Sequence, residues 1–144
     1  MRRISVGVVV GILSVSALAS AQPQPWPMRA HGVLAQMLQG PSGVSIAQSV
    51  QRITHPSGSD ANLAKYEIRH VGETLSVWLF VSWSGGLGGA HTTVVVWDFD
   101  YKRHRNAAIL RDDAPFPTSD KDLRRLDAYF RDEIYPIVRR QAGN

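Results

Sequence analysis

The sequence predicts an α+β fold, an antiparallel sheet of four to five strands with an N-terminal helix and a C-terminal helix packed on it. Two long runs rich in Val, Thr, Phe and Trp, at 75–83 and 92–99, are typical of strands. The glycine-rich segment between them permits the tight connection that antiparallel neighbours need. Apolar residues at helical spacing, over 27–39 and again over 123–137, predict the two flanking helices.

The first 21 residues have the pattern of an export signal. Arg2 and Arg3 precede an apolar run, and Ala19-Ser20-Ala21 offers small residues for cleavage. The run is shorter than the roughly 20 residues that span a bilayer, although a retained membrane anchor is the alternative. We expect a signal peptide over 1–21, an extended lead-in over 22–27 and a single α+β domain over 28–144, located in the periplasm or secreted.

The composition excludes several classes of site. The chain contains no Cys, so it has neither disulfides, thiol catalysis nor Cys-based zinc sites. Without Arg2 and Arg3, 14 of the 16 Lys and Arg remain, against 12 Asp and Glu. This near balance gives no strong attraction to nucleic acid, and export argues against such a partner.

The remaining segments are less uniform. Residues 44–54 suit a helix through Ile46, Val50 and Ile53, but alternate residues suit a strand equally well. Side chains of residues 65–71 alternate in polarity, which is typical of a strand with one solvent-exposed face. Residues 107–111 predict another strand. Between the last two strands, residues 98–106 are almost all polar, which predicts a long solvated hairpin tip.

The final helix is the best specified. Thr118 and Ser119 offer a cap, while Asp120 and Asp122 place negative charge in the first turn, which the helix dipole favours. Pro136 removes one backbone donor and is expected to kink or end the helix near 132–135.

His91 is the most suggestive candidate for chemistry. It follows the glycines and precedes Asp98, Asp100 and His104, so a small hydrolase using His91 with Asp98 or Asp100 is one hypothesis. In a regular strand, however, His91 and Asp98 point to opposite faces and lie about 23 Å apart. Convergence of these side chains in a cleft would favour an enzyme, and scatter over two faces would favour a binding protein.

Other catalytic patterns are absent from the sequence. The glycines lack the following Lys and helix of a phosphate-binding loop, no G-x-S-x-G marks a nucleophile, and no calcium-loop pattern surrounds the acidic pairs. We therefore expect no catalytic residue, no metal site and no cofactor. The pairs Asp98/Asp100 and Asp112/Asp113 are interpreted as turn formers and ion-pair partners of nearby arginines.

Two surfaces are predicted to bind a partner. The first is the glycine-rich connection with its flanking aromatic and histidine, in which an exposed Trp would anchor a protein or glycan. The second is a basic cluster in the solvated tip. The candidate residues are Trp83, Gly85, Gly86, Gly88, Gly89 and His91 in the first surface, and Lys102, Arg103, His104 and Arg105 in the second.

A short series of motifs resembles a known family. Gly88-Gly89-Ala90-His91, then Trp97-Asp98-Phe99-Asp100, then Leu110-Arg111-Asp112-Asp113 with Phe116, is similar to a GGAH…FD…L-x-D-x-F pattern. That pattern belongs to an exported domain of unknown function found in lysozyme-sensing anti-sigma factors and peptidoglycan deacetylases. The resemblance covers 66–142 and implies an α+β envelope-binding module with no chemistry of its own.

These observations favour an exported, non-enzymatic binding protein. It would act as an inhibitor, immunity or sensor module toward an envelope protein or a cell-wall glycan, with no stable membrane anchor once the signal is cleaved. A structural accessory of an envelope complex is a further alternative.

Overall fold

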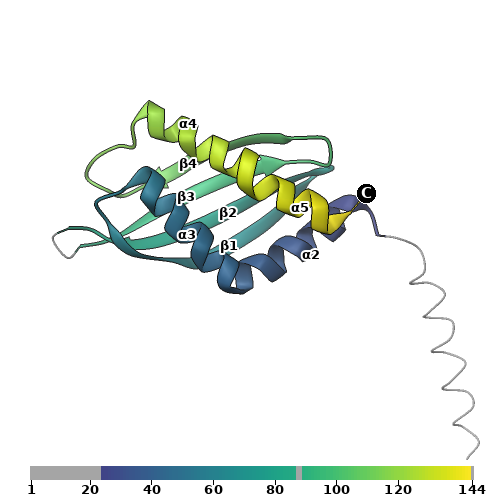
Figure 1. The fold of residues 1–144 in the computed structure, drawn as a ribbon, viewed down its shortest axis with the longest axis horizontal. Helices are drawn as coiled ribbons and strands as arrows, with labels where there is room; N and C mark the ends of the chain where they lie inside the picture. Colours follow the sequence, from purple (N-terminus) through teal and green to yellow (C-terminus); the bar gives the residue numbers. More distant parts are fainter. Residues whose placement is uncertain (1–23, 87–88, 144) are drawn as a thin grey trace, which may run out of the picture.

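The structure is a computed structural model that describes residues 24–86 and 89–143. The expected signal peptide, residues 1–21, lies outside the described part of the chain. One antiparallel sheet has the strand order β1-β2-β3-β4, and the helices cover one of its faces (Figure 1). The strands are β1 (Ser59–Val71), β2 (Thr74–Ser84), β3 (Ala90–Phe99) and β4 (His104–Asp112). The helices are α2 (Trp26–Gln39), α3 (Pro41–Thr54), α4 (Asp120–Tyr129), the π-helical turn η1 (Phe130–Ile134) and α5 (Tyr135–Ala142).

This architecture confirms the predicted α+β class, with four strands in the sheet. The ambiguous segment 44–54 forms part of α3, so the strand alternative is wrong. The physical reason is its apolar face: Ile46, Ala47 and Val50 are all buried toward the sheet and α2. Two helices rather than one therefore precede the sheet.

The core lies between the sheet and the helices. Alternate residues of β2, starting at Leu75 and ending at Trp83, are buried on the helix-covered face. Leu126, Phe130 and Val138 of the C-terminal helices are fully buried against them. At about 1.5–3 kcal/mol for each large apolar side chain, this burial holds the helical layer on the sheet.

Two predicted boundaries differ from the structure. Helix α2 begins at Trp26, inside the expected lead-in, because Trp26 is buried and packs edge-on against Phe99 with ring centroids 6.0 Å apart. The solvated tip is shorter than 98–106, because Phe99 is fully buried and extends β3. Only residues 100–103 connect β3 to β4.

The C-terminal helix agrees with its sequence signals. The hydroxyl of Ser119 accepts a hydrogen bond from the backbone N–H of Asp122 at 3.1 Å, which confirms the cap. The π-helical turn η1 ends two residues before Pro136, so the regular hydrogen-bond pattern breaks where the prediction placed the kink. Among the helices of the described residues, none is long and apolar enough to cross a membrane.

Candidate functional site

A cleft of about 520 Å³ opens at one end of the sheet, next to the connection between β2 and β3. Three segments line it: 54–57 after α3, 83–91 around the β2–β3 connection, and 114–117 between β4 and α4. These segments are far apart in the sequence, and they meet at the end of the molecule where α3 ends and α4 begins (Figure 1). We call this cavity the cleft, and residues 85–89 the glycine joint.

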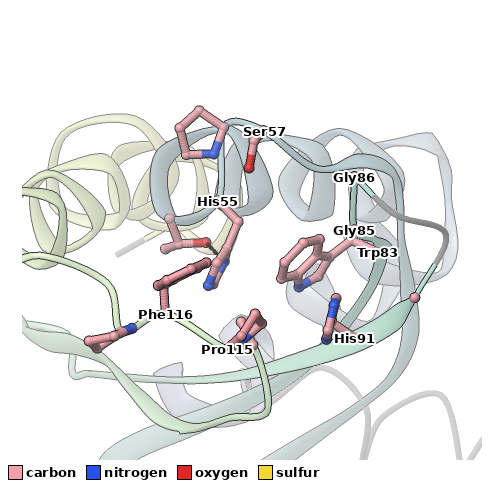
Figure 2. A pocket seen from close by; sticks show the side chains of 13 residues that line it. His55, Ser57, Trp83, Gly85, Gly86, His91, Pro115 and Phe116 are labelled. Carbon is pink, nitrogen blue, oxygen red and sulfur yellow. Dashed lines mark hydrogen bonds between the residues drawn. The ribbon is translucent and has the colours of Figure 1, made fainter.

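Three aromatic rings form a row along the cleft. Figure 2 shows the indole of Trp83 between the imidazoles of His55 and His91. The ring centroids of Trp83 and His55 are 4.4 Å apart, and those of Trp83 and His91 are 4.7 Å apart. Trp83 and His91 are direct partners in the β2–β3 register, which is why their rings meet. His55 joins them because it ends α3 above the sheet.

Hydrogen bonds fix the indole in this row. Trp83 donates its Nε1–H to the hydroxyl of Thr93 at 3.0 Å, and that hydroxyl donates to Oδ1 of Asp112 at 3.3 Å. The same oxygen accepts the backbone N–H of Ala114 at 3.1 Å. Asp112 thus ties β4 and the loop that follows it to the ring row.

His55 is held on both ring nitrogens. Its Nδ1 lies 2.8 Å from the hydroxyl of Thr54, and its Nε2 lies 2.8 Å from Oδ2 of Asp112. The second pair is close but not aligned for a hydrogen bond. Burial lowers the pKa of His55, and the neighbouring Asp112 carboxylate opposes that shift. Contact with Thr54 and Asp112 places both ring nitrogens against other protein atoms, so His55 supports the wall of the cleft.

His91 is held on one side only. Its Nδ1 lies 3.3 Å from Oδ1 of Asp113, an oxygen that also accepts the backbone N–H of Thr92 at 2.9 Å. Its Nε2 edge packs against Gly85 and Gly89 of the glycine joint. A Cβ added at Gly85 would lie 2.8 Å from Nε2. The imidazole therefore presents Nε2 at the cleft wall formed by the joint.

Within the joint, Gly85 makes room for a side chain. The described glycines with positive φ are Gly72 and Gly143, so Gly85 and Gly86 do not use the left-handed backbone that a glycine permits. Gly85 instead leaves room for His91, and Gly58 leaves room for the ring of Trp83. Gly88 lies outside the described residues.

The other polar residues suggested for chemistry lie away from His91. Asp98 pairs with Ser76 and Asn106, toward the far end of β3. Asp100 accepts hydrogen bonds from the backbone N–H groups of Lys102 and Arg103, at 2.8 and 3.0 Å. It also forms an ion pair with Arg105 at 2.8 Å. These residues are scattered, and the carboxylate beside His91 is Asp113.

His104 is also a structural residue. Its side chain is 5% exposed, its Nδ1 accepts the indole N–H of Trp97 at 3.0 Å, and its Nε2 lies 2.9 Å from Oδ1 of Asp127. An indole nitrogen only donates, so Nδ1 is the acceptor and Nε2 carries the proton. Arg105, Lys102 and Arg103 are exposed around the turn that Asp100 organises. We call residues 102–105 the basic tip.

The expectation of an exposed Trp anchor at residue 83 is wrong, because Trp83 is only 5% exposed. Its edge lines the cleft, but His55 and His91 flank its ring. Trp78 is half-buried on the sheet face away from the helices, where the guanidinium of Arg69 lies 3.8 Å from its ring centroid.

Sequence reasoning missed three parts of the cleft: His55, the Asp112–Asp113 pair as partners of histidines, and the 115–117 segment. The sequence held no clear signal for the carboxylates. Counted from the turn at residues 100–103, a regular hairpin would place Thr93 opposite Leu110, and two register shifts bring Asp112 there instead. His55 was not predictable either, because α3 reaches the cleft only through the packing of the whole domain.

Among residues 24–86 and 89–143, no group of three or more His, Asp or Glu side chains is arranged to hold a metal ion. Comparison with family models, with curated proteins and with solved structures found no match to this chain. The resemblance to the exported domain therefore stays a prediction.

Proposed function

We propose that this chain is an exported binding protein for an envelope protein, and that the cleft is its binding site. The observation that carries the proposal is a preformed cavity of about 520 Å³ with mostly apolar walls and a fixed row of rings. Ligand pockets of roughly 300–1,000 Å³ with apolar walls and a few placed polar groups are the usual form of a binding site. An inhibitor, immunity or sensor role is compatible with such a site.

The walls favour a protein segment over a cell-wall glycan. Glycans present many hydroxyls and need many hydrogen-bond partners, yet the cleft offers Pro56, Pro115, Phe116 and Pro117 around the ring row. The side chain of Phe116 is 77% exposed at the cleft. An exposed aromatic beside an apolar cavity is a suitable anchor for an apolar side chain of a partner.

The basic tip, the second predicted surface, is less suited to this role. Its turn is closed by Asp100, which uses its oxygens on Lys102, Arg103 and Arg105 of the same hairpin. The cavity nearest to it mixes acidic and basic side chains, including Glu73 and Arg105. Arg105 is already paired with Asp100 and His104 is buried against Asp127, so Lys102 and Arg103 are the side chains of the tip left to a partner.

One observation favours a second candidate, a small hydrolase. A histidine oriented by a carboxylate, with its other nitrogen toward a cavity, is the arrangement of a general base. His91 and Asp113 have part of it, in place of the expected Asp98 or Asp100: Asp113 lies beside Nδ1, and Nε2 lies at the cleft wall formed by Gly85 and Gly89. The hydroxyl of Ser57 lines the same cleft, but within the described residues it makes no hydrogen bond with His91. The test is hydrolysis of p-nitrophenyl acetate. Activity in the unaltered protein that the His91→Gln variant lacks would favour the hydrolase over the binding protein.

The proposal is tested by capture of a partner from the envelope fraction of the source cells, with matched variants. Phe116→Ala removes an exposed apolar group at the cleft, and Val71→Ala removes one that is 69% exposed at the opposite end of the sheet. We expect a partner that the unaltered protein and Val71→Ala capture and that Phe116→Ala loses. Equal capture by all three proteins would contradict the cleft as the binding site.

A double change, Lys102→Ala with Arg103→Ala, tests the basic tip in the same experiment. We expect capture to be retained, because the turn hydrogen bonds to Asp100 use backbone N–H groups that alanine keeps. If this variant alone failed to capture the partner, the binding site would lie at the basic tip and not in the cleft.

A further inference from the structure

The charges beside the cleft are negative. Its described lining contains no Lys, Arg, Asp or Glu, and the two carboxylates next to it approach its histidines from behind the lining. The adjoining cavity, of about 340 Å³, shares residues 114–117 with the cleft and also has no Lys or Arg in its described lining. The charged groups nearest to the two histidines are the carboxylates of Asp112 and Asp113, at 2.8 and 3.3 Å.

Only one of these carboxylates is open to a ligand. Asp112 is 14% exposed, and it uses one oxygen on Thr93 and Ala114 and turns the other toward His55. Asp113 is 57% exposed, and its Oδ1 takes the backbone N–H of Thr92 and faces His91. Within the described part of the chain, Oδ2 of Asp113 has no partner, so it can accept a hydrogen bond or pair with a cation.

The imidazole of His91, beside Asp113, also favours a ligand that donates hydrogen bonds. A neutral His91 places its proton on Nδ1, since Oδ1 of Asp113 lies on that side. Nε2 is then an acceptor, and it faces the joint at Gly85 and Gly89. Two acceptors, one of them negatively charged, thus lie beside an apolar cavity. A ligand carboxylate would meet like charge, whereas an ammonium or guanidinium group would be attracted and could donate hydrogen bonds.

On the basis of the proposed function, we infer that the cleft recognises a basic apolar segment of the partner protein, in which a large apolar side chain lies next to a Lys or Arg. The apolar side chain occupies the cavity between Phe116 and the ring row, and the neighbouring cation pairs with Oδ2 of Asp113. The complementarity of charge selects this segment from other apolar segments of the same size.

Three matched peptides test this inference on the protein recovered after export: N-acetyl-phenylalanyl-lysine amide, its glutamine analogue and its glutamate analogue. Their binding is followed by NMR through the backbone amides of Gly85 and Gly89 and the indole N–H of Trp83. We expect affinity to fall from the lysine to the glutamine to the glutamate peptide, by about fivefold at each step, the size of an exposed ion pair. Added salt should reduce these differences.

Asp113→Asn is the decisive variant, because an asparagine keeps the oxygen that accepts from Thr92 but loses the charge. We expect it to abolish the preference for lysine while the glutamine peptide binds as before. Asp98→Asn, on the far part of β3, is the matched control and should keep the preference.

The outcomes separate this inference from the proposed function. Equal affinities, a preference for the glutamate peptide, or a lysine preference that survives Asp113→Asn would overturn the inference alone, since each still requires binding at the cleft. If none of the peptides shifts the cleft resonances, the proposed function fails and the inference fails with it.

Discussion

Each end of the β3–β4 hairpin has a histidine beside an aspartate, but only His91, at the open end of the hairpin, lines a cavity itself. His91 has Asp113 at 3.3 Å and a side chain that is 20% exposed, and it lines the cleft with Nε2 against Gly85 and Gly89. His104 has Asp127 at 2.9 Å and a side chain that is 5% exposed, with Nδ1 occupied by the indole of Trp97. The difference teaches that residue type and spacing do not define a site. A histidine–aspartate pair becomes available for function where the ring lines a cavity and one of its nitrogens has no hydrogen-bond partner among the described residues.

The same contrast holds for the two connecting segments, the glycine joint and the basic tip. The glycine joint adjoins an apolar cavity and has no charged residues of its own. The basic tip has four charged or titratable residues, but Asp100 and Asp127 bind two of their side chains internally. Charge that pairs within its own hairpin contributes to stability and offers little to a partner. The following predictions test this comparison.

The largest effect is expected from Trp83→Ala. The indole is 5% exposed and packs between two imidazoles, and its loss leaves a cavity and removes the N–H that the Thr93 hydroxyl accepts. We expect the free energy of unfolding to fall by about 3–5 kcal/mol, as in other large-to-small core changes. Urea unfolding measures it, and a loss below about 1 kcal/mol would show that the ring row is not part of the core.

Replacing the two histidines compares the ends directly. His104→Ala leaves the buried indole N–H of Trp97 without an acceptor, and we expect a loss of about 1–3 kcal/mol in the free energy of unfolding. His91→Ala should cost less than about 1 kcal/mol but weaken binding at the cleft. Unfolding curves and peptide titrations on both variants provide the measurement. Equal stability losses, with no change in binding for His91→Ala, would remove the distinction.

The pH dependence of stability reports on His55. Burial lowers its pKa below the usual 6.5, despite the opposing Asp112, so the unfolded chain binds its proton at a higher pH than the folded protein does. The contribution of this group is fully present above pH 6.5 and is lost as the pH falls toward the folded pKa. The slope is at most about 1.4 kcal/mol per pH unit.

His55→Gln removes this titration, so its unfolding free energy should fall less steeply between pH 6.5 and 5 than that of the unaltered protein. Chemical denaturation at several pH values gives both slopes. Parallel slopes would mean that other groups cause the acid destabilisation.

The smallest effect is expected within the glycine joint. A Cβ at Gly85 would lie 2.8 Å from Nε2 of His91, while a Cβ at Gly86 would have nothing within 4 Å. Gly85→Ala should therefore displace the imidazole, cost about 1 kcal/mol and shift the resonances of His91. Gly86→Ala is the matched control and should be neutral or slightly stabilising. Identical spectra for the His91 ring in the two variants would show that the glycine makes no room for it.

Much of the fold could be predicted because it depends on local patterns. The period of two in β2, the cap at Ser119 and the proline at 136 act within a few residues of themselves. The segment 44–54 could not be assigned, because its apolar residues fit two periods and only packing on the sheet decides between them.

The site was predictable only in part. The glycine joint and His91 were identified from a single stretch, and both line the cleft. The partner of His55 is 57 positions away, at Asp112, and this pairing depends on α3 and β4 reaching the same end of the sheet. Residues brought together by tertiary packing leave no periodic signal in one sequence.

The most direct test of the central claim is amide hydrogen exchange on the protein with and without its captured partner. If the cleft is the binding site, the amides of 85–91 and 113–117 should exchange more slowly in the complex, while those of 100–105 should exchange as in the free protein. Slowed exchange confined to 100–105, with the cleft segments unchanged, would contradict it.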